Sequence, residues 1–176
     1  GLQSGRTFIT NGPALFLTVD GAMPGERIDS PHGHLRKVSG AISWHSHYPI
    51  NRVELIHNGG VAQCKSLEGA AGQRNGKWEF DIAIETDGWL AARAYGDARD
   101  SFAHAIYAHT SPVYIGAGRP AEIAQASATF FVRSLDDSID WVSRVGRFTK
   151  DEQREEVLHL FREGRKVYAD LAEREI

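Results

Sequence analysis

Three observations predict a mainly β chain: an immunoglobulin-like antiparallel β-sandwich followed by a C-terminal helical hairpin. The first two thirds of the 176 residues alternate apolar and polar side chains with the period of a strand. Turn signals divide this part into about seven short runs, as in a sandwich. After the glycines at 116 and 118, apolar residues recur every three or four positions, as in helices. We therefore expect a sandwich over residues 1–117 and a two-helix hairpin over 118–176.

The clearest strand is Lys77–Glu85, because its apolar residues alternate strictly with charged or small ones. Its inward face would carry Trp78, Phe80, Ile82 and Ile84. Two further strands follow the same pattern, with inward residues Val38, Ile42 and Trp44 in Lys37–Trp44 and Leu15, Leu17 and Val19 in the other. One face of each strand is therefore expected in the core.

A β-hairpin is predicted where Asn51–His57 meets Asn58-Gly59-Gly60 and then Val61–Cys64, because Asn and Gly adopt the positive φ of a tight turn. Two more strands, Trp89–Tyr95 and Phe102–Ala108, are expected on either side of a turn at Gly96-Asp97.

The helical part begins near Ile123 and is interrupted by Gly146-Arg147-Phe148. Thr149 and Glu152 have the spacing of a capping box for the second helix. That helix would carry its apolar residues on one side, namely Val157, Leu158, Phe161, Tyr168 and Leu171. This apolar face must be covered, either by the sandwich of the same chain or by a second copy in a homo-oligomer.

Charge and composition exclude several classes of function. A formal net charge of −3 and a pI near 6.2, with no cluster of Lys or Arg, argue against nucleic-acid binding. The longest apolar runs are far shorter than a membrane span. Cys64 has no second cysteine to pair with inside the chain. The chain opens at Gly1 without methionine, so we expect natural sequence upstream, and the compartment stays open.

Two H-x-H pairs raise the possibility of a metal site, because residues two apart in a strand share a face. They are His32 with His34 and His45 with His47. If the strand ending at Trp44 continued, the second pair would lie on the solvated face with Lys37 and Ser39, and we favour surface histidines in a turn before Pro49. A self-contained hydrolase would need three or more metal ligands. No metal site is assigned to this chain.

Two further positions allow a functional or a structural interpretation. His109 and Ser111 could form a nucleophile and a base, but no third group orients the base, so we favour hydroxyls that satisfy backbone groups before Pro112. Arg93 either packs its stem on Trp89 or pairs with Glu54, or it points across an interdomain cleft.

Four segments of the chain carry a resemblance to a known family. They are Gly5–Pro13, Arg52–Gly59, Trp89–Ala94 and Ala108–Tyr114. In order and spacing they resemble the C-terminal region of the carbaryl-hydrolase-like (CehA/McbA) branch of PHP-type metallohydrolases. His32–Gly40 superficially resembles the first metal-binding motif of PHP hydrolases, but it lacks the acidic residue between Ser39 and Gly40, and we treat it as coincidence.

The resemblance implies a non-catalytic accessory domain. In that family a metal-binding barrel comes first and carries the activity, and its metal ligands have no counterparts here. This chain would pack on, or shape, the active-site cleft of a barrel upstream in the same polypeptide. The divalent metal would belong to the parent enzyme, with no cofactor in this chain. No catalytic residue is assigned, and the candidates for the face toward the barrel are Arg6, Thr7, Asn11, Arg93 and His109.

A different class of function is an independent immunoglobulin-like module that binds carbohydrate or protein, because such folds host binding sites without catalysis. Trp89, Tyr95 and Tyr107 distinguish these alternatives. If they line one open face, they suit a glycan platform, and if the helices bury them, they do not.

Overall fold

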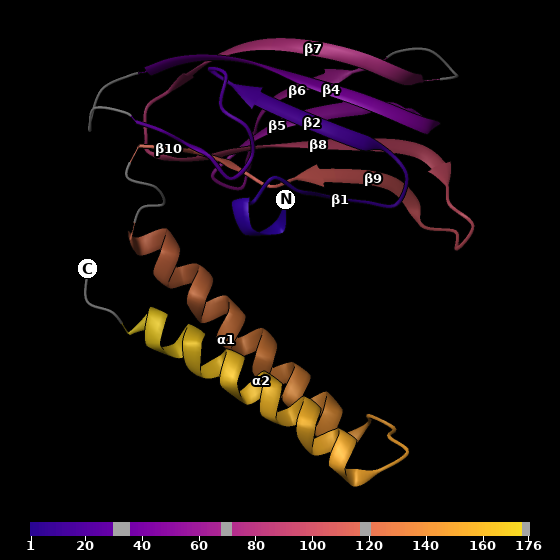
Figure 1. Cartoon of the computed structure of the whole chain (residues 1–176), viewed down its shortest axis with the longest axis vertical. Helices are drawn as coiled ribbons and strands as arrows, with labels where there is room; N and C mark the ends of the chain where they lie inside the picture. The colour runs from indigo at the N-terminus through magenta and orange to yellow at the C-terminus, as the bar shows by residue number, and fades with distance from the viewer. Residues whose placement is uncertain (30–35, 68–71, 117–120, 174–176) are drawn as a thin grey trace. The chain divides into compact units, whose positions relative to one another are not determined.

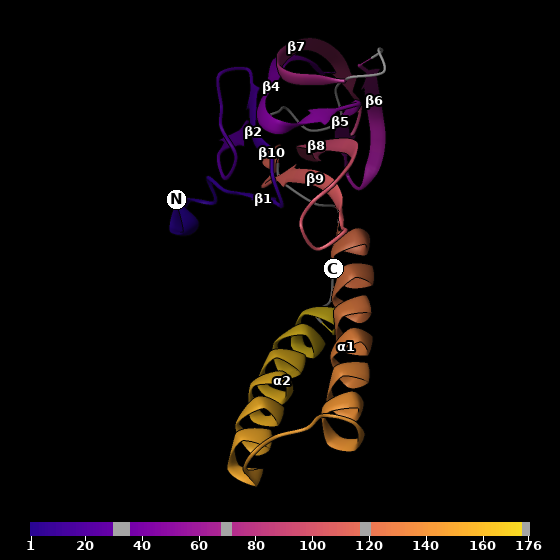
Figure 2. The same cartoon turned by 90° about the vertical axis from the view of Figure 1, so that its right-hand side faces the viewer.

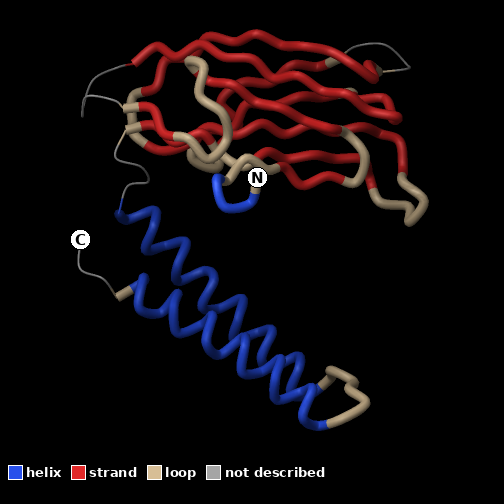
Figure 3. The backbone as a smooth tube through the Cα atoms, viewed as in Figure 1, coloured by secondary structure: helices blue, strands red, loops and turns tan. Residues whose placement is uncertain are grey.

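The computed structural model of the chain describes residues 1–29, 36–67, 72–116 and 121–173. It divides into two compact units, Gly1–Arg119 and Pro120–Ile176. The first unit is built of strands with one short 3-10 turn, η1 (Leu2–Ser4), and the second of two helices (Figure 1 and Figure 3). The predicted fold class, a β-sandwich followed by two helices, is confirmed.

The sandwich consists of a three-stranded and a seven-stranded sheet. The three-stranded sheet is antiparallel and runs in the order β2 (Ala14–Val19), β4 (Arg36–Ile50) and β7 (Gln73–Ile84). The seven-stranded sheet contains β1 (Phe8–Thr10), β3 (Arg27–Ile28), β5 (Arg52–His57), β6 (Gly60–Ser66), β8 (Gly88–Arg99), β9 (Ala105–Thr110) and β10 (Val113–Ile115). Its centre is β8, which pairs with β5 on one side and with β9 and β10 on the other. The short pairing of β3 with β10 is parallel.

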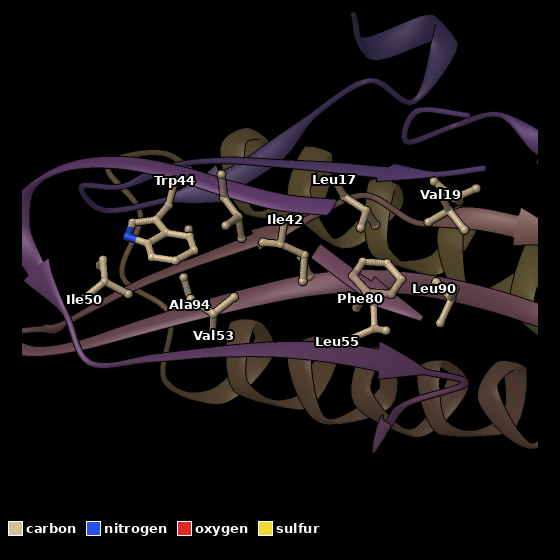
Figure 4. Close-up of a cluster of buried hydrophobic side chains, with 14 of the residues drawn as sticks. Leu17, Val19, Ile42, Trp44, Ile50, Val53, Leu55, Phe80, Leu90 and Ala94 are labelled. Atoms are coloured by element: carbon tan, nitrogen blue, oxygen red, sulfur yellow. The ribbon is translucent and has the colours of Figure 1, made fainter. Parts of the chain in front are cut away.

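The core lies between the two sheets, where the alternation predicted it (Figure 4). All three strands of the smaller sheet point their predicted apolar residues inward. These residues pack against residues of the larger sheet such as Val53, Leu55, Leu90 and Ile106. Trp44 is fully buried, and its indole Nε1 donates to the carbonyl of Gln73 at 3.2 Å. A side chain at Gly76 would collide with the Trp44 ring, since an added Cβ would lie 2.3 Å from it. Trp44 and Gly76 are therefore a matched large-and-small pair.

The β5–β6 hairpin is the predicted one. Asn58 has φ 49° and Gly59 has φ 92°, the two positive values that a two-residue turn requires. The Asn58 side chain also ties the turn to its neighbour, because its amide donates to the carbonyl of Asp87 and accepts from the Trp89 N–H. The turn is therefore held by its backbone and by a side chain.

The turn predicted at Gly96-Asp97 is wrong. Strand β8 continues through both residues to Arg99, and the change of register between Gly96 and Arg99 is absorbed as an irregularity against β9. Gly96 is needed for a different reason, since an added Cβ would lie 2.2 Å from the carbonyl oxygen of Pro49. The chain turns instead at Asp100, whose carboxylate accepts the N–H groups of Phe102 and His104 at 2.9 Å each. For this reason β9 starts at Ala105 and not at Phe102.

The second unit is a hairpin of two antiparallel helices, α1 (Ala121–Arg144) and α2 (Asp151–Ala172), which lie side by side in Figure 1 and Figure 2. The predicted capping box is wrong, because α2 begins one residue later, with Lys150 as N-cap and no side-chain cap. The acidic side chains of Asp151 and Glu152 in the first turn complement the helix dipole instead. Neither helix, over its described residues, is long and apolar enough to cross a membrane.

Candidate functional site: the outer face of the seven-stranded sheet

The outer face is the side of the seven-stranded sheet that points away from the core. Side chains alternate along each strand, so the register of the sheet decides which residues share this face. Residues directly opposite one another are Glu54, Arg93 and His109 in one row across β5, β8 and β9, and Arg52, Tyr95 and Tyr107 in the next. Ile9 of β1 extends the first row, because it lies opposite His109. We call these seven residues the outer-face cluster.

The cluster is organised around a buried carboxylate. Glu54 is 3% exposed, and one of its oxygens accepts from Arg93 Nε at 3.0 Å and Nη2 at 2.8 Å. Its other oxygen pairs with Arg52. A carboxylate in such a position is stable only when it is paired, because burial of an isolated charge is costly. Glu54 therefore holds the Arg93 guanidinium in a fixed place on the sheet.

His109 lies next to this fixed cation. Burial lowers the pKa of the His109 imidazole below its ordinary value, and the positive charge of Arg93 lowers it further. The ring is therefore favoured in its neutral form, in which one nitrogen donates and the other accepts.

Aromatic and apolar side chains surround the charged centre. The Arg93 guanidinium lies 5.7 Å from the centre of the Tyr95 ring, within the range of a cation–π contact. Tyr107, opposite Tyr95, is 40% exposed, and Ile9 is 68% exposed. Trp89 lies four residues before Arg93 in β8, so its side chain is on the same outer face, and it is half-buried. The three aromatics named as a test of glycan binding thus lie on one face of the sheet.

The structure brings together only two of the five residues proposed from the sequence, Arg93 and His109. Thr7 lies just before the start of β1, where its hydroxyl is 2.6 Å from that of Ser111. Arg6 pairs with Glu26 near the surface. Asn11 lies at the opposite end of β1, where its side chain bonds to Asp100, the Ala105 carbonyl and the Tyr107 N–H. Asn11 therefore joins the end of β1 to the loop before β9 and to β9 itself by hydrogen bonds.

Three members of the outer-face cluster, Arg52, Glu54 and Ile9, are not among the site residues predicted from the sequence. The sequence suggests Glu54 only as a partner of Arg93. Because neighbouring side chains in a strand point to opposite faces, Glu54 must point away from the core when Val53 and Leu55 point into it. Ile9 was missed because the short run Phe8-Ile9-Thr10 does not show by itself which of its residues points outward.

His45 and His47 do not lie in the turn that the sequence suggests. Strand β4 continues through His45 and His47 to Ile50, so these residues lie in a strand and not in a turn. Both are exposed, as expected for the continued strand, and His45 Nδ1 lies 3.1 Å from the amide oxygen of Asn75. His32 and His34 lie outside the described residues. Within the described ranges no three His, Cys, Asp or Glu side chains form a group that could hold a metal ion.

The strand-end residues near Pro112 make structural hydrogen bonds. The buried Thr110 hydroxyl accepts the backbone N–H of Ala92 at 3.0 Å. Ser111 bonds through its hydroxyl to Thr7, and through its N–H to the Thr7 carbonyl at 2.8 Å. These contacts join the start of β1 to the end of β9.

Comparisons with known proteins find two solved structures that are similar to this chain. No protein-family model and no curated protein matches the chain. The fibronectin(III)-like modules of Clostridium thermocellum CbhA are similar at 17% identity and a TM-score of 0.33, covering 59% of this chain and 99% of that chain. The CARDB domain of a Pyrococcus furiosus protein is similar at 11% identity and a TM-score of 0.34, covering 59% and 95%. The assignment of a β-sandwich is based on the two sheets of this structure.

Proposed function

We propose that the β-sandwich is a non-catalytic binding module that docks another folded protein domain through the outer-face cluster. The observation that carries the proposal is the Arg93 guanidinium, which is fixed by the buried Glu54 and shares its face of the sheet with the exposed Tyr107 and Ile9. Arginine and tyrosine dominate the binding energy of many protein interfaces. A side chain that is already held in place also loses less conformational entropy when a partner binds.

The family resemblance suggests which domain the partner is. Each of the four segments that carry the resemblance falls in the seven-stranded sheet. Gly5–Pro13 contains β1, Arg52–Gly59 contains β5, Trp89–Ala94 lies in β8, and Ala108–Tyr114 spans the end of β9 and most of β10. We propose that the partner is the upstream metal-binding barrel of a PHP-type hydrolase, in the same polypeptide. The sandwich would then border the cleft of that barrel, and the divalent metal would be bound by the barrel.

Glycan binding is the second candidate for the same face. Tyr95 and Tyr107 lie directly opposite each other on neighbouring strands, and Trp89 shares their face. Aromatic rings on an open sheet can stack on the apolar faces of sugars. This candidate needs the rings to carry the affinity, whereas docking of a protein domain also needs the fixed charge of Arg93.

Both candidates can be tested with three variants of the chain. Ile9→Ser with Tyr107→Ala removes the exposed apolar part of the cluster, and Arg93→Met removes its charge. Lys77→Met removes an exposed charge from β7 of the three-stranded sheet and is the control. Binding would be measured by calorimetry against the separately produced upstream domain, and by affinity electrophoresis in soluble polysaccharides.

Docking of a protein domain predicts that both cluster variants weaken binding of the upstream domain at least tenfold, about 1.4 kcal/mol, while Lys77→Met does not. Retardation by a polysaccharide that is lost in Ile9→Ser/Tyr107→Ala and kept in Arg93→Met would favour the glycan candidate. Wild-type protein that binds neither probe would overturn both.

A further inference from the structure

The helical hairpin leaves one of its sides apolar and exposed. The two helices pack on each other through buried residues such as Ala128, Val142 and Leu158. Other large apolar side chains remain open to solvent: Phe130 is 64% exposed and Trp141 59% on α1, and Leu160 is 68% and Val167 58% on α2. Scattered apolar residues are normal at a surface, but a contiguous patch marks an interaction site.

These exposed side chains lie on the same side of the hairpin. Phe130 and Trp141 are three helical turns apart on α1, and Leu160, Val167 and Leu171 follow helical spacing on α2. A hollow of about 530 Å³ spans both helices on this side, and its lining includes Trp141, Val157 and Phe161. We call this surface the apolar side of the hairpin.

Contacts between the helices show which residues lie at the same level along the hairpin. The Phe131 ring stacks on Tyr168 with ring centres 4.8 Å apart. Arg165 Nε lies 2.6 Å from an oxygen of Asp136. Continued along the two antiparallel helices, these pairs place Trp141 level with Val157 and Leu160. They also place Phe130 level with Val167 and Leu171, so that apolar residues of both helices lie together at two levels of this side, one of them at the hollow.

Charged residues border the apolar side. On α2, Glu156, Glu163 and Asp170 recur every seven residues, so they form one row, and none of them has an ion-pair partner among the described residues. On α1 the corresponding margin carries Arg133 and Arg144, three turns apart, together with Asp137 and Asp140. Asp140 is paired with Arg144 at 2.7 Å. One margin is therefore acidic, and the other carries two arginines and two aspartates.

We propose that a second copy of this chain covers the apolar side, so that two hairpins form an antiparallel four-helix bundle. The two-fold axis runs parallel to the helices and sets α1 of each copy on α2 of the other. This operation preserves levels, so Trp141 meets the cluster of Val157 and Leu160 in the second copy. Each copy thus buries a side that a two-helix hairpin cannot bury alone.

Charge disfavours the alternative arrangement more strongly. With the two-fold axis parallel to the helices, Arg144 comes level with Glu156 of the second copy, Arg133 comes level with the space between Glu163 and Asp170, and one like-charge pair, Asp137 with Glu163, is brought to the same level. An axis perpendicular to the helices would instead set α2 against α2 and place the two acidic rows side by side. Like charges across an interface disfavour that pairing. This inference does not depend on the function proposed for the sandwich.

The association can be measured by sedimentation equilibrium on the full chain, with a reductant present because Cys64 is exposed. We expect a dimer. Leu160→Asp, which changes an exposed side chain, should weaken dimerisation at least tenfold while the helical circular dichroism is unchanged. Phe102→Asp is the matched control, because Phe102 is 79% exposed on the loop before β9. It should leave the dimer intact.

A charge exchange tests the arrangement of the dimer. Glu156→Arg should weaken dimerisation by placing two arginines at one level, and Arg144→Glu combined with Glu156→Arg should restore it. A wild-type chain that is monomeric at its highest soluble concentration would overturn the proposal. So would a dimer that Leu160→Asp leaves intact. A dimer that Leu160→Asp breaks but the charge exchange does not restore would overturn the parallel two-fold axis.

Discussion

At the scale of single residues, the sandwich depends on polar side chains that the sheet places away from its core. Glu54 is the clearest case, since it is almost fully buried on the outer face and shared by Arg52 and Arg93. Removal of one member of such a group leaves a charge without its partner, which costs more than the pair contributes when intact. Arg52, Glu54 and Arg93 are therefore fixed as a unit within the sheet itself.

His109 makes folding stability depend on pH. Its pKa is lowered in the folded state, so between that value and the ordinary 6.5 the unfolded chain binds more protons. The contribution is fully present above pH 6.5 and is lost as pH falls through the folded pKa. His109→Gln should therefore flatten the rise of unfolding free energy with pH across this window, measured by urea denaturation at a series of pH values. His47→Gln is the control, and an unchanged slope in His109→Gln would contradict the assignment.

At the scale of elements, the β5–β6 turn allows a matched comparison of two adjacent glycines. Gly59 has φ 92°, whereas Gly60 lies outside the left-handed region, and an added Cβ there would make only an ordinary contact at 3.6 Å. Gly59→Ala should lower the free energy of unfolding by about 1–2 kcal/mol, because an L-residue is strained at positive φ. Gly60→Ala should change it by less than about 0.5 kcal/mol. Equal effects in chemical denaturation would show that φ is not the cause.

Elements with a strict period could be predicted from the sequence, and those set by distant contacts could not. The alternation in Lys77–Glu85 and the Asn58-Gly59 turn are local signals, and both were predicted correctly. The false turn at Gly96-Asp97 shows the limit, because that glycine serves a close approach to Pro49, which is remote in sequence. The start of α2 was missed by one residue because two acidic side chains compensate for the absent cap.

The candidate site was predictable only in part for the same reason. The sequence predicts that Arg93 lies in a strand and His109 at the end of another, but their position opposite each other depends on the register between β8 and β9. That register is set by the packing of many residues and by an irregularity near Gly96, which no local pattern reveals. Arg6 and Asn11 belong to the same motif as Thr7, yet they lie at different ends of β1 and bond to different loops.

At the scale of the whole molecule, the two units differ in what completes them. The sandwich encloses a core between its own sheets, with Trp44 and the other large core residues fully buried. The hairpin buries few side chains and keeps Trp141 and Leu160 exposed. A unit of two helices rarely buries enough apolar surface to be stable alone. Its stability should therefore depend on the partner that covers it.

The two units should consequently unfold in two transitions that respond differently to protein concentration. Folding that is coupled to association becomes more stable as concentration rises, whereas folding within one chain does not. In thermal melts followed by circular dichroism at helical and strand wavelengths, tenfold dilution should lower the midpoint of the helical transition by a few degrees and leave that of the sandwich unchanged. Leu160→Asp should remove the concentration dependence of the helical transition. A single transition that does not respond to dilution would instead mean that the apolar side of the hairpin is covered within its own chain.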